Sequence, residues 1–339
     1  MAGGSAKAVY AAIVANSIVT VAKFAAFFAT GSGAMLSEGI HSAADVGNQS
    51  LLALGIKKSQ QAPDDDHPYG YTREQFLWAL ISAVGIFFLG CGVTVVHGIH
   101  TIQDALAGNA HKVENLTVAW VVLVLAFLVE GWSLWVAYKS VKAAAVEKGW
   151  TLMHYVRKGP DPMGVAVLFE DSAAVFGVAL AGGAMGMAHW TDNAVWDGAG
   201  SIAIGILMGV LAIFLIQKNR TFLIGRAVDS SIRDRLEGIL ESDPVVEEVD
   251  QMRATVTGAA SSEMRAQIDF DGQELARRTL ANEDLEGTWE KINDPEQLRT
   301  YLEAFGERIT DQMALEIDRL ETRIQEEVPD MHQVDLEAE

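Results

Sequence analysis

Long apolar segments recur through the first two thirds of this 339-residue sequence, and they decide what it can fold into. A helix needs about 20 mostly apolar residues to cross a bilayer. Six segments meet this description or come close to it: residues 6–30, 35–56, 75–103, 114–140, 162–188 and 195–217. The sequence therefore predicts a polytopic α-helical membrane protein, with six transmembrane helices in a domain of residues 1–219 and with the lipid bilayer as its surroundings.

The charge of the chain is concentrated outside these segments. Of the formal net charge of −20, a net −17 lies in residues 220–339. This asymmetry predicts a second, water-exposed domain there. Nucleic acid is excluded as a partner because phosphate binding needs a basic surface. The single cysteine, Cys91, excludes an intrachain disulfide and a cysteine-based zinc site.

Lysine and arginine in the short loops indicate the orientation of the spans. They gather after the second, fourth and sixth spans, at residues 57–74, 140–161 and 218–226. We therefore expect both termini in the cytoplasm, which agrees with an even number of spans. The N-terminal segment has neither a basic signal-peptide start nor an arginine-rich transit composition, which favours a bacterial inner (plasma) membrane.

The pattern beyond residue 225 is that of a small α+β domain. An amphipathic helix is predicted over 230–242, strands over 245–256 and 264–270, and helices from 273 to 280 and from 295 to 325. Val334 and Leu336 fit a short last strand, and residues 282–298 read as a polar insertion. This order, helix-strand-strand-helix-strand, predicts a ferredoxin-like domain.

Polar residues in two of the apolar segments form the candidate site. In the second segment Glu38, His41, Asp45 and Asn48 are spaced to lie along one stripe of a helix. Glu170 and Asp171 lie in the middle of the fifth. An imidazole with carboxylates suits Zn²⁺, and in the absence of a thiolate it suits Mn²⁺, Co²⁺ or Fe²⁺ as well.

The alternative interpretation of these residues is that they only hold helices together by hydrogen bonds and salt bridges. Neither helix carries Lys or Arg at the same depth, so uncompensated carboxylates there must be protonated or bound to an ion. A site that alternates between protons and metal would exchange one for the other. We therefore expect a site for a transported divalent metal ion at His41, Asp45 and Asp171, with protons as the counter-ion.

Several stretches resemble the cation diffusion facilitator family of metal transporters. SEGIHSAADVGNQSLLALG and DDDHPYGYTREQ resemble its second span and following loop. VLFEDSAAVFG resembles the fifth span of one branch, that of the animal mitochondrial zinc transporter, as do YVRKGPDP, DGAGSIAIGILMG and FLIGRAV around it. The resemblance extends over about residues 1–280, in order.

This resemblance implies a proton-driven zinc exporter that works as a homodimer, with residues 220–339 as a cytoplasmic regulatory or dimerisation domain. It also implies a His/Asp-x-x-x-Asp pair on the second span, which His41 and Asp45 fill. A similar pair on the fifth span would be Val167 and Asp171. Since valine cannot bind metal, Glu170 either supplies the missing ligand through a distortion of the helix or takes part directly in proton movement.

Other polar residues have two interpretations each. His67 with Asp65 and Asp66 is either a second metal site in a cytoplasmic loop or a solvated charged run. Glu38, Asn48 and Glu130 either relay protons and support the ligands or serve packing alone. Asp197 is expected to cap the helix that it begins.

Two other classes of function use the same carboxylates. An intramembrane enzyme would need a nucleophile or metalloprotease signature, and the sequence has neither a nucleophile elbow nor HExxH. A membrane metal sensor would bind the ion without moving it. The sequence thus favours a secondary transporter for zinc, with manganese, cobalt or iron as alternative substrates, and no enzymatic activity.

Overall fold

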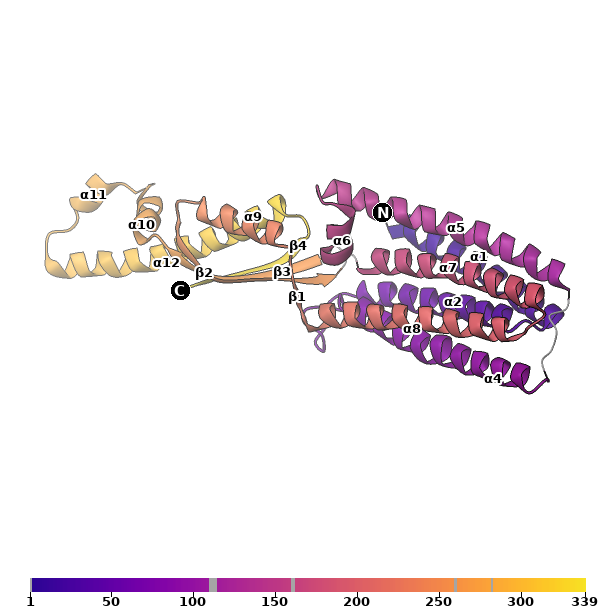
Figure 1. Cartoon of the computed structure of the whole chain (residues 1–339). Helices are drawn as coiled ribbons and strands as arrows, with labels where there is room; N and C mark the ends of the chain where they lie inside the picture. Colours follow the sequence, from indigo (N-terminus) through magenta and orange to yellow (C-terminus); the bar gives the residue numbers. More distant parts are fainter. Residues whose placement is uncertain (1, 110–114, 160–161, 259–260, 282) are drawn as a thin grey trace. The chain divides into compact units, whose positions relative to one another are not determined.

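The computed structural model describes residues 2–109, 115–159, 162–258, 261–281 and 283–339. The chain divides into two compact units, residues 1–224 and 225–339 (Figure 1). The first unit is helical, and the second combines a sheet with helices.

The first unit is built from long helices. Their bounds are α1 Ala2–Thr30, α2 Gly33–Ser59, α3 Glu74–Gly85, η1 Ile86–Val93, α4 Thr94–Leu106, α5 Leu116–Glu147, α6 Leu152–Lys158, α7 Pro162–Thr191 and α8 Val195–Ile224. Within the described residues, four helices are long and apolar enough to cross a membrane: Glu74–Leu106, Leu116–Glu147, Gly164–Thr191 and Val195–Ile224. The predicted helical membrane domain is confirmed in this form.

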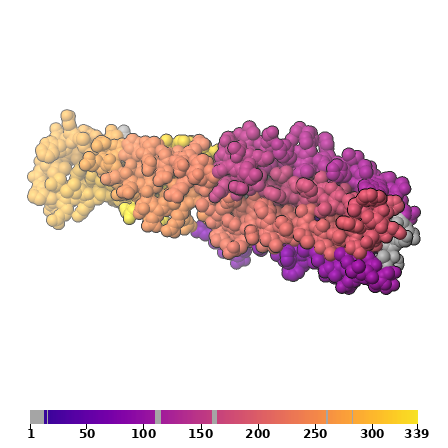
Figure 2. Space-filling model, viewed as in Figure 1, coloured from indigo at the N-terminus to yellow at the C-terminus, as the bar shows by residue number. Residues whose placement is uncertain are grey.

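Small residues bring α8 close to its neighbours. A Cβ atom added to Gly98 of α4 would lie 2.8 Å from the carbonyl oxygen of Gly198, so the two backbones touch. Large apolar side chains such as Phe127, Trp132 and Val210 face outward instead. Figure 2 shows side chains of α5, α7 and α8 forming one face of this unit. An apolar exterior over a core of small residues is the packing expected of helices in lipid.

The second unit contains a four-stranded mixed sheet. Its elements are β1 Arg226–Ala227, α9 Ser230–Glu241, β2 Val246–Gly258, β3 Ser261–Phe270, α10 Gly272–Leu280, α11 Leu285–Trp289, α12 Pro295–Glu327 and β4 Met331–Ala338. The strand order is β1-β2-β3-β4, with antiparallel pairs except for the parallel pair of β3 and β4. The predicted order of helices and strands is confirmed, with β1 and α11 in addition.

Aspartates begin the helices of this unit. The Asp271 carboxylate accepts from the backbone N–H groups of Gln273 at 2.8 Å and Glu274 at 3.0 Å. Asp294 does the same at the start of α12, where Pro295 occupies the first turn. Such caps satisfy donors that a helix leaves open, and proline fits there because it has no N–H to satisfy. Part of the acidic composition thus fixes where the helices start.

An arginine-rich cluster ties α9, α10 and α12 together. Asp243 Oδ2 accepts from Arg319 at 2.8 Å and from Arg323 at 3.3 Å. Glu316 Oε2 accepts from Arg278 at 2.7 Å and from Arg319 at 2.6 Å. We call these five residues the arginine cluster.

The arginines shift the acidity of both carboxyls. Burial acts to raise the pKa of Asp243, but the hydrogen bond and charge of Arg319 outweigh it and leave the pKa below its ordinary value. The pKa of Glu316 is likewise lowered, because hydrogen bonds from Arg278 and Arg319 outweigh its burial. Both groups therefore stay ionised in the folded unit.

Candidate metal-binding site

The stripe predicted on the second apolar segment lies along α2. His41 and Asp45 are four residues apart, hence on one face of the helix, and His41 Nε2 lies 3.3 Å from Asp45 Oδ2. His41 is buried, and neither ring nitrogen has a hydrogen-bond partner among the described residues. A buried imidazole that makes no hydrogen bond is available to a ligand.

Glu170 and Asp171 of α7 face different neighbours, as adjacent residues on a helix must. Asp171 Oδ2 accepts from Ser133 Oγ of α5 at 2.8 Å. Glu170 Oε2 accepts from Asn48 Nδ2 of α2 at 2.5 Å, while Glu170 Oε1 is buried without a partner among the described residues. Asn48 in turn accepts from Ser82 of α3 at 2.5 Å. Asn48 thus positions Glu170.

A small cavity joins the two helices. Asp45, Glu170 and Asp171 all line it, and so does Glu130 of α5. The rest of its lining is Asn16, Val19, Ser42, Gln49, Ser133 and Ala174. Its volume is about 20 Å³, which is room for one water-sized particle. Three carboxylates from two helices, joined by a fourth from α5, therefore face a space that fits a single ion.

In this conformation the candidate ligands do not converge on one point. Within the described residues, no three His, Cys, Asp or Glu side chains lie close enough together to hold a metal ion. His41, next to Ser42 of the lining, does not itself line the cavity. The ligand set of His41, Asp45, Asp171 and Glu170 stays a prediction.

A buried lysine lies beside these carboxylates. Lys23 of α1 has a fully buried side chain, and its Nζ donates to Glu38 Oε2 at 2.8 Å, Ser42 Oγ at 2.8 Å and Glu130 Oε1 at 2.6 Å. We call Lys23, Glu38 and Glu130 the lysine triad. The expectation from the sequence concerned cations on the second and fifth spans alone, whereas the cation that pairs with Glu38 and Glu130 comes from α1.

Lys23 was not predicted as a partner because it lies outside the two helices that carry the predicted ligands. The signal was present: a lysine inside the apolar segment 6–30. An ionisable residue in such a segment is expected to pair with others at the same depth.

The loop between α2 and α3 is organised by Asp64. Its Oδ1 accepts from the backbone N–H groups of Asp66 and His67, and its Oδ2 accepts from the Tyr71 hydroxyl at 2.7 Å. That bond raises the pKa of Tyr71 to about 12 and lowers the pKa of Asp64. His67 Nδ1 lies 3.6 Å from Asp64 Oδ1. The second metal site at His67, Asp65 and Asp66 stays a prediction, and its best-placed carboxylate is Asp64.

Asp197, at the start of α8, caps a different helix from the one expected. Its carboxylate accepts from Ser32 Oγ at 2.7 Å and from the backbone N–H groups of Gly33 and Ala34. These are the first residues of α2, so the cap joins α8 to the end of the helix that carries His41 and Asp45.

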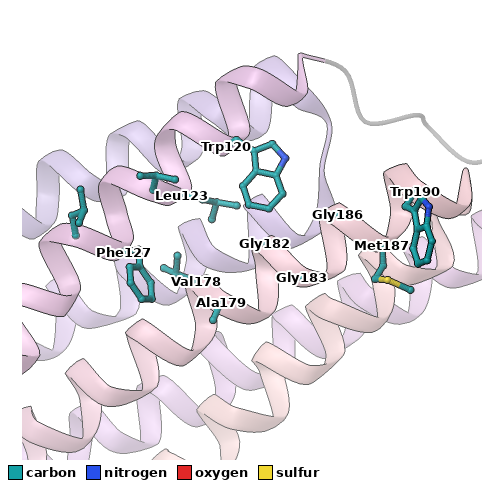
Figure 3. Close-up of a pocket in the computed structure, with 12 residues that line it drawn as sticks. Trp120, Leu123, Phe127, Val178, Ala179, Gly182, Gly183, Gly186, Met187 and Trp190 are labelled. Carbon is teal, nitrogen blue, oxygen red and sulfur yellow. The ribbon is translucent and has the colours of Figure 1, made fainter.

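A larger hollow lies between α5 and α7 (Figure 3). Trp120, Phe127, Val178 and Trp190 are among its lining residues, which include no carboxylate, imidazole or thiol. It therefore offers none of the carboxylate and imidazole ligands expected for Zn²⁺, and the candidate site is the small polar cavity.

Comparison with known proteins identifies the family of this chain. The model of the cation efflux transmembrane domain matches residues 9–224. Metal tolerance protein C4 of Arabidopsis thaliana is 40% identical over 98% of this chain and 73% of its own length.

Mitochondrial proteins named proton-coupled zinc antiporter SLC30A9 are similar over the same part of the chain. The mouse protein is 39% identical and the human protein 37% identical, each over 98% of this chain. This chain spans only 59% and 58% of their lengths. The match to the family model and the identity to the plant protein show that the chain belongs to the cation efflux family of metal transporters, also called the cation diffusion facilitators.

Proposed function

We propose that this protein exchanges zinc for protons across a membrane. The observation that carries the proposal is the cavity between α2 and α7, where Asp45, Glu170 and Asp171 face one ion-sized space. Carboxylates at this depth must be neutralised by protons or by a cation. A cavity that is emptied of metal whenever it takes up protons couples the two flows in opposite directions.

Asp45, Asp171 and His41 are the proposed ligands, and Glu170 is the fourth. Zn²⁺ accepts four such nitrogen and oxygen donors in a tetrahedral arrangement. Since His41 does not line the cavity, loading requires its side chain to move towards Asp45 and the cavity. Asn48, Glu38 and Glu130 are proposed as the surrounding groups that position ligands or pass protons. Without a thiolate in the set, Mn²⁺, Co²⁺ and Fe²⁺ are the alternative substrates.

The proposed topology has six spans, with α1 and α2 added to the four apolar helices. The polar stripe of α2 is then shielded from lipid by α1, α3 and α7, which explains its low hydropathy. Both termini lie on the side of the lysine-rich loops. The expected bacterial inner membrane has no support from the comparisons, since the mouse and human relatives are named mitochondrial.

Residues 225–339 are proposed to be a ferredoxin-like regulatory domain through which two copies of the chain associate. The parallel pairing of β3 and β4, with α10 to α12 as the crossover, supports the split βαβ arrangement of such a fold. Association in pairs is what the resemblance to the cation diffusion facilitators implies, and it is part of this proposal.

The test is zinc flux into proteoliposomes with an imposed pH gradient. Asp45→Asn and Asp171→Asn remove one charge each with little change in shape, and Asp318→Asn, exposed on α12, is the matched control. We expect both site variants to lose at least about 100-fold in flux, since even outer-shell partners of a metal contribute 10–100-fold.

Competition by Mn²⁺, Co²⁺ and Fe²⁺ in the same assay ranks the alternative substrates. Zinc binding without flux in the wild-type protein would replace the antiporter by a sensor. Flux that survives both substitutions would place the site elsewhere.

A further inference from the structure

The lysine triad has unequal numbers of charges. One ammonium serves two carboxylates, so Lys23, Glu38 and Glu130 together carry a net charge of −1 when all three are ionised. Each carboxylate gives one oxygen to Lys23, and the other oxygens, Glu38 Oε1 and Glu130 Oε2, are buried without a hydrogen-bond partner among the described residues. The triad therefore has capacity for more positive charge than Lys23 supplies.

The two glutamates differ in what they face. Glu130 lines the small cavity, as does Ser42, the third acceptor of the Lys23 ammonium. Glu38 is absent from the lining and packs against α7, where a Cβ atom added to Gly177 would lie 2.5 Å from Glu38 Oε1. An ion in the cavity can therefore reach Glu130 but not Glu38.

Lys23 and an ion in the cavity compete for the same carboxylate. Glu130 Oε1 is bound to the ammonium at 2.6 Å while the residue faces the cavity. A divalent ion in that space attracts Glu130 and repels the ammonium, and both effects are strong where water is excluded. Glu130 Oε2, which has no donor among the described residues, can meet the ion directly, and repulsion between the ion and the ammonium then loosens the bond from Lys23 to Oε1.

We propose that Lys23 is the resident cation of the empty transporter, which neutralises Glu38 and Glu130 and gives up Glu130 when the metal ion enters the cavity. This inference rests on the proposed function and deepens it. Lys23 then sets how tightly the metal is held, and its competition keeps binding weak enough for release. It also links α1 to the occupancy of the cavity, because the Lys23–Glu130 bond joins α1 to α5.

Two double variants test the proposal because they carry equal charge. Lys23→Met with Glu38→Gln leaves only Glu130 ionised, and Lys23→Met with Glu130→Gln leaves only Glu38. Both keep the net charge of −1, so a difference between them reports which carboxylate meets the ion. The measurement is the zinc dissociation constant of the full chain in detergent at fixed pH, by competition with a fluorescent chelator.

We expect the variant that keeps Glu130 to bind zinc at least tenfold more tightly than the variant that keeps Glu38, and more tightly than the wild type. The single variant Lys23→Arg keeps the positive charge at this position, and it should bind zinc with a dissociation constant near that of the wild type. Equal zinc affinity of the two double variants, with only their thermal stability changed, would show that the triad serves packing and would overturn the proposal.

Zinc binding and zinc flux of the wild type and of the two double variants distinguish a failure of this inference from a failure of the proposed function. Wild-type protein that neither binds nor moves zinc would end both. Wild-type protein that moves zinc against protons, together with double variants of equal affinity, would leave the antiporter intact and remove only the role of Lys23.

Discussion

In residues 1–224 one lysine serves two glutamates, whereas in the arginine cluster of residues 225–339 three arginines surround two carboxylates. The Lys23 and Glu38 side chains are fully buried. In the arginine cluster the side chains of Asp243 and Glu316 are buried, but that of Arg319 is 41% exposed. The lysine triad thus lies buried between helices, whereas the arginine cluster exposes arginine side chains to water.

The difference shows which network can take another cation. All four carboxylate oxygens of Asp243 and Glu316 accept a hydrogen bond from a named donor. Guanidinium groups donate to Asp243 Oδ2 and Glu316 Oε2, while the Val245 backbone N–H and the Gln312 amide donate to the other two oxygens. In the lysine triad, Glu38 Oε1 and Glu130 Oε2 have no donor in the part of the chain that the structure describes. A network in which every carboxylate oxygen accepts a hydrogen bond stabilises a fold. A network with free carboxylate oxygens can bind a transported cation.

The largest expected effect is on the stability of the helical unit. Lys23→Met leaves two buried carboxylates without their cation, and breaking a buried pair in this way costs about 3–5 kcal/mol. We expect a large fall in the midpoint of thermal unfolding in detergent. Adding Glu38→Gln and Glu130→Gln should recover most of the loss; a single variant as stable as this triple variant would contradict the charge argument.

Gly177→Ala tests how tightly the lysine triad is packed, because the added methyl group contacts Glu38 and leaves the charge of the triad unchanged. The new Cβ atom would lie 2.5 Å from Glu38 Oε1, so α7 or Glu38 must shift. Overpacking of this kind costs about 1–3 kcal/mol. Gly183→Ala is the matched control, because a Cβ atom there meets nothing within 4 Å. Equal unfolding midpoints for the two variants would show that Glu38 is not held against α7.

Arg319→Met should have a smaller effect on the second unit. Asp243 keeps Arg323, and Glu316 keeps Arg278, so no carboxylate is left alone. We expect a loss of about 1–2 kcal/mol, seen as faster hydrogen exchange in α9 and α12 of the full chain. Arg299→Met, exposed on the same helix, is the control. No change relative to this control would mean that the cluster adds nothing to stability.

The smallest effect is the response of the second unit to acid. The pKa values of Asp243 and Glu316 are lower in the folded unit than in the unfolded chain. Their stabilisation is therefore present above the unfolded values of about 4 and is lost as the pH falls through the folded values. Circular dichroism of the full chain should show a loss of secondary structure as the pH falls from 6 to 3. This loss should be smaller in Asp243→Asn. An unchanged transition would assign the acid response to other carboxylates.

The elements of the second unit could be predicted because their signals are local. The amphipathic pattern of α9 and the alternation in β2 and β3 lie within single segments, and the structure contains them near the expected residues. Residues 282–298 were predicted only as a polar insertion. They include α11 and the first turn of α12, whose start depends on the cap at Asp294.

Contacts in the candidate site could be predicted from the sequence only where both residues lie on the same helix. The contact between His41 and Asp45 follows from helical spacing. The bond from Asn48 to Glu170 and that from Lys23 to Glu130 join residues more than 100 positions apart. A single sequence gives the depth of each residue but not the faces on which helices meet, so these partners required the structure. For the same reason Asp197 was assigned to its own helix and not to α2.

Because Asp197 of α8 caps α2, the N-terminal end of α2 is attached to α8. With Gly33 held by α8, a tilt of α2 pivots about that point, and displacement grows with distance along the axis. Asp45 lies 12 residues further on, about 18 Å away at 1.5 Å per residue, so a tilt of about 5° would move it by about 1.6 Å. Metal–ligand distances tolerate only about ±0.2 Å. A few degrees of rotation about this pivot would thus be enough to assemble the proposed ligand set or to separate its members.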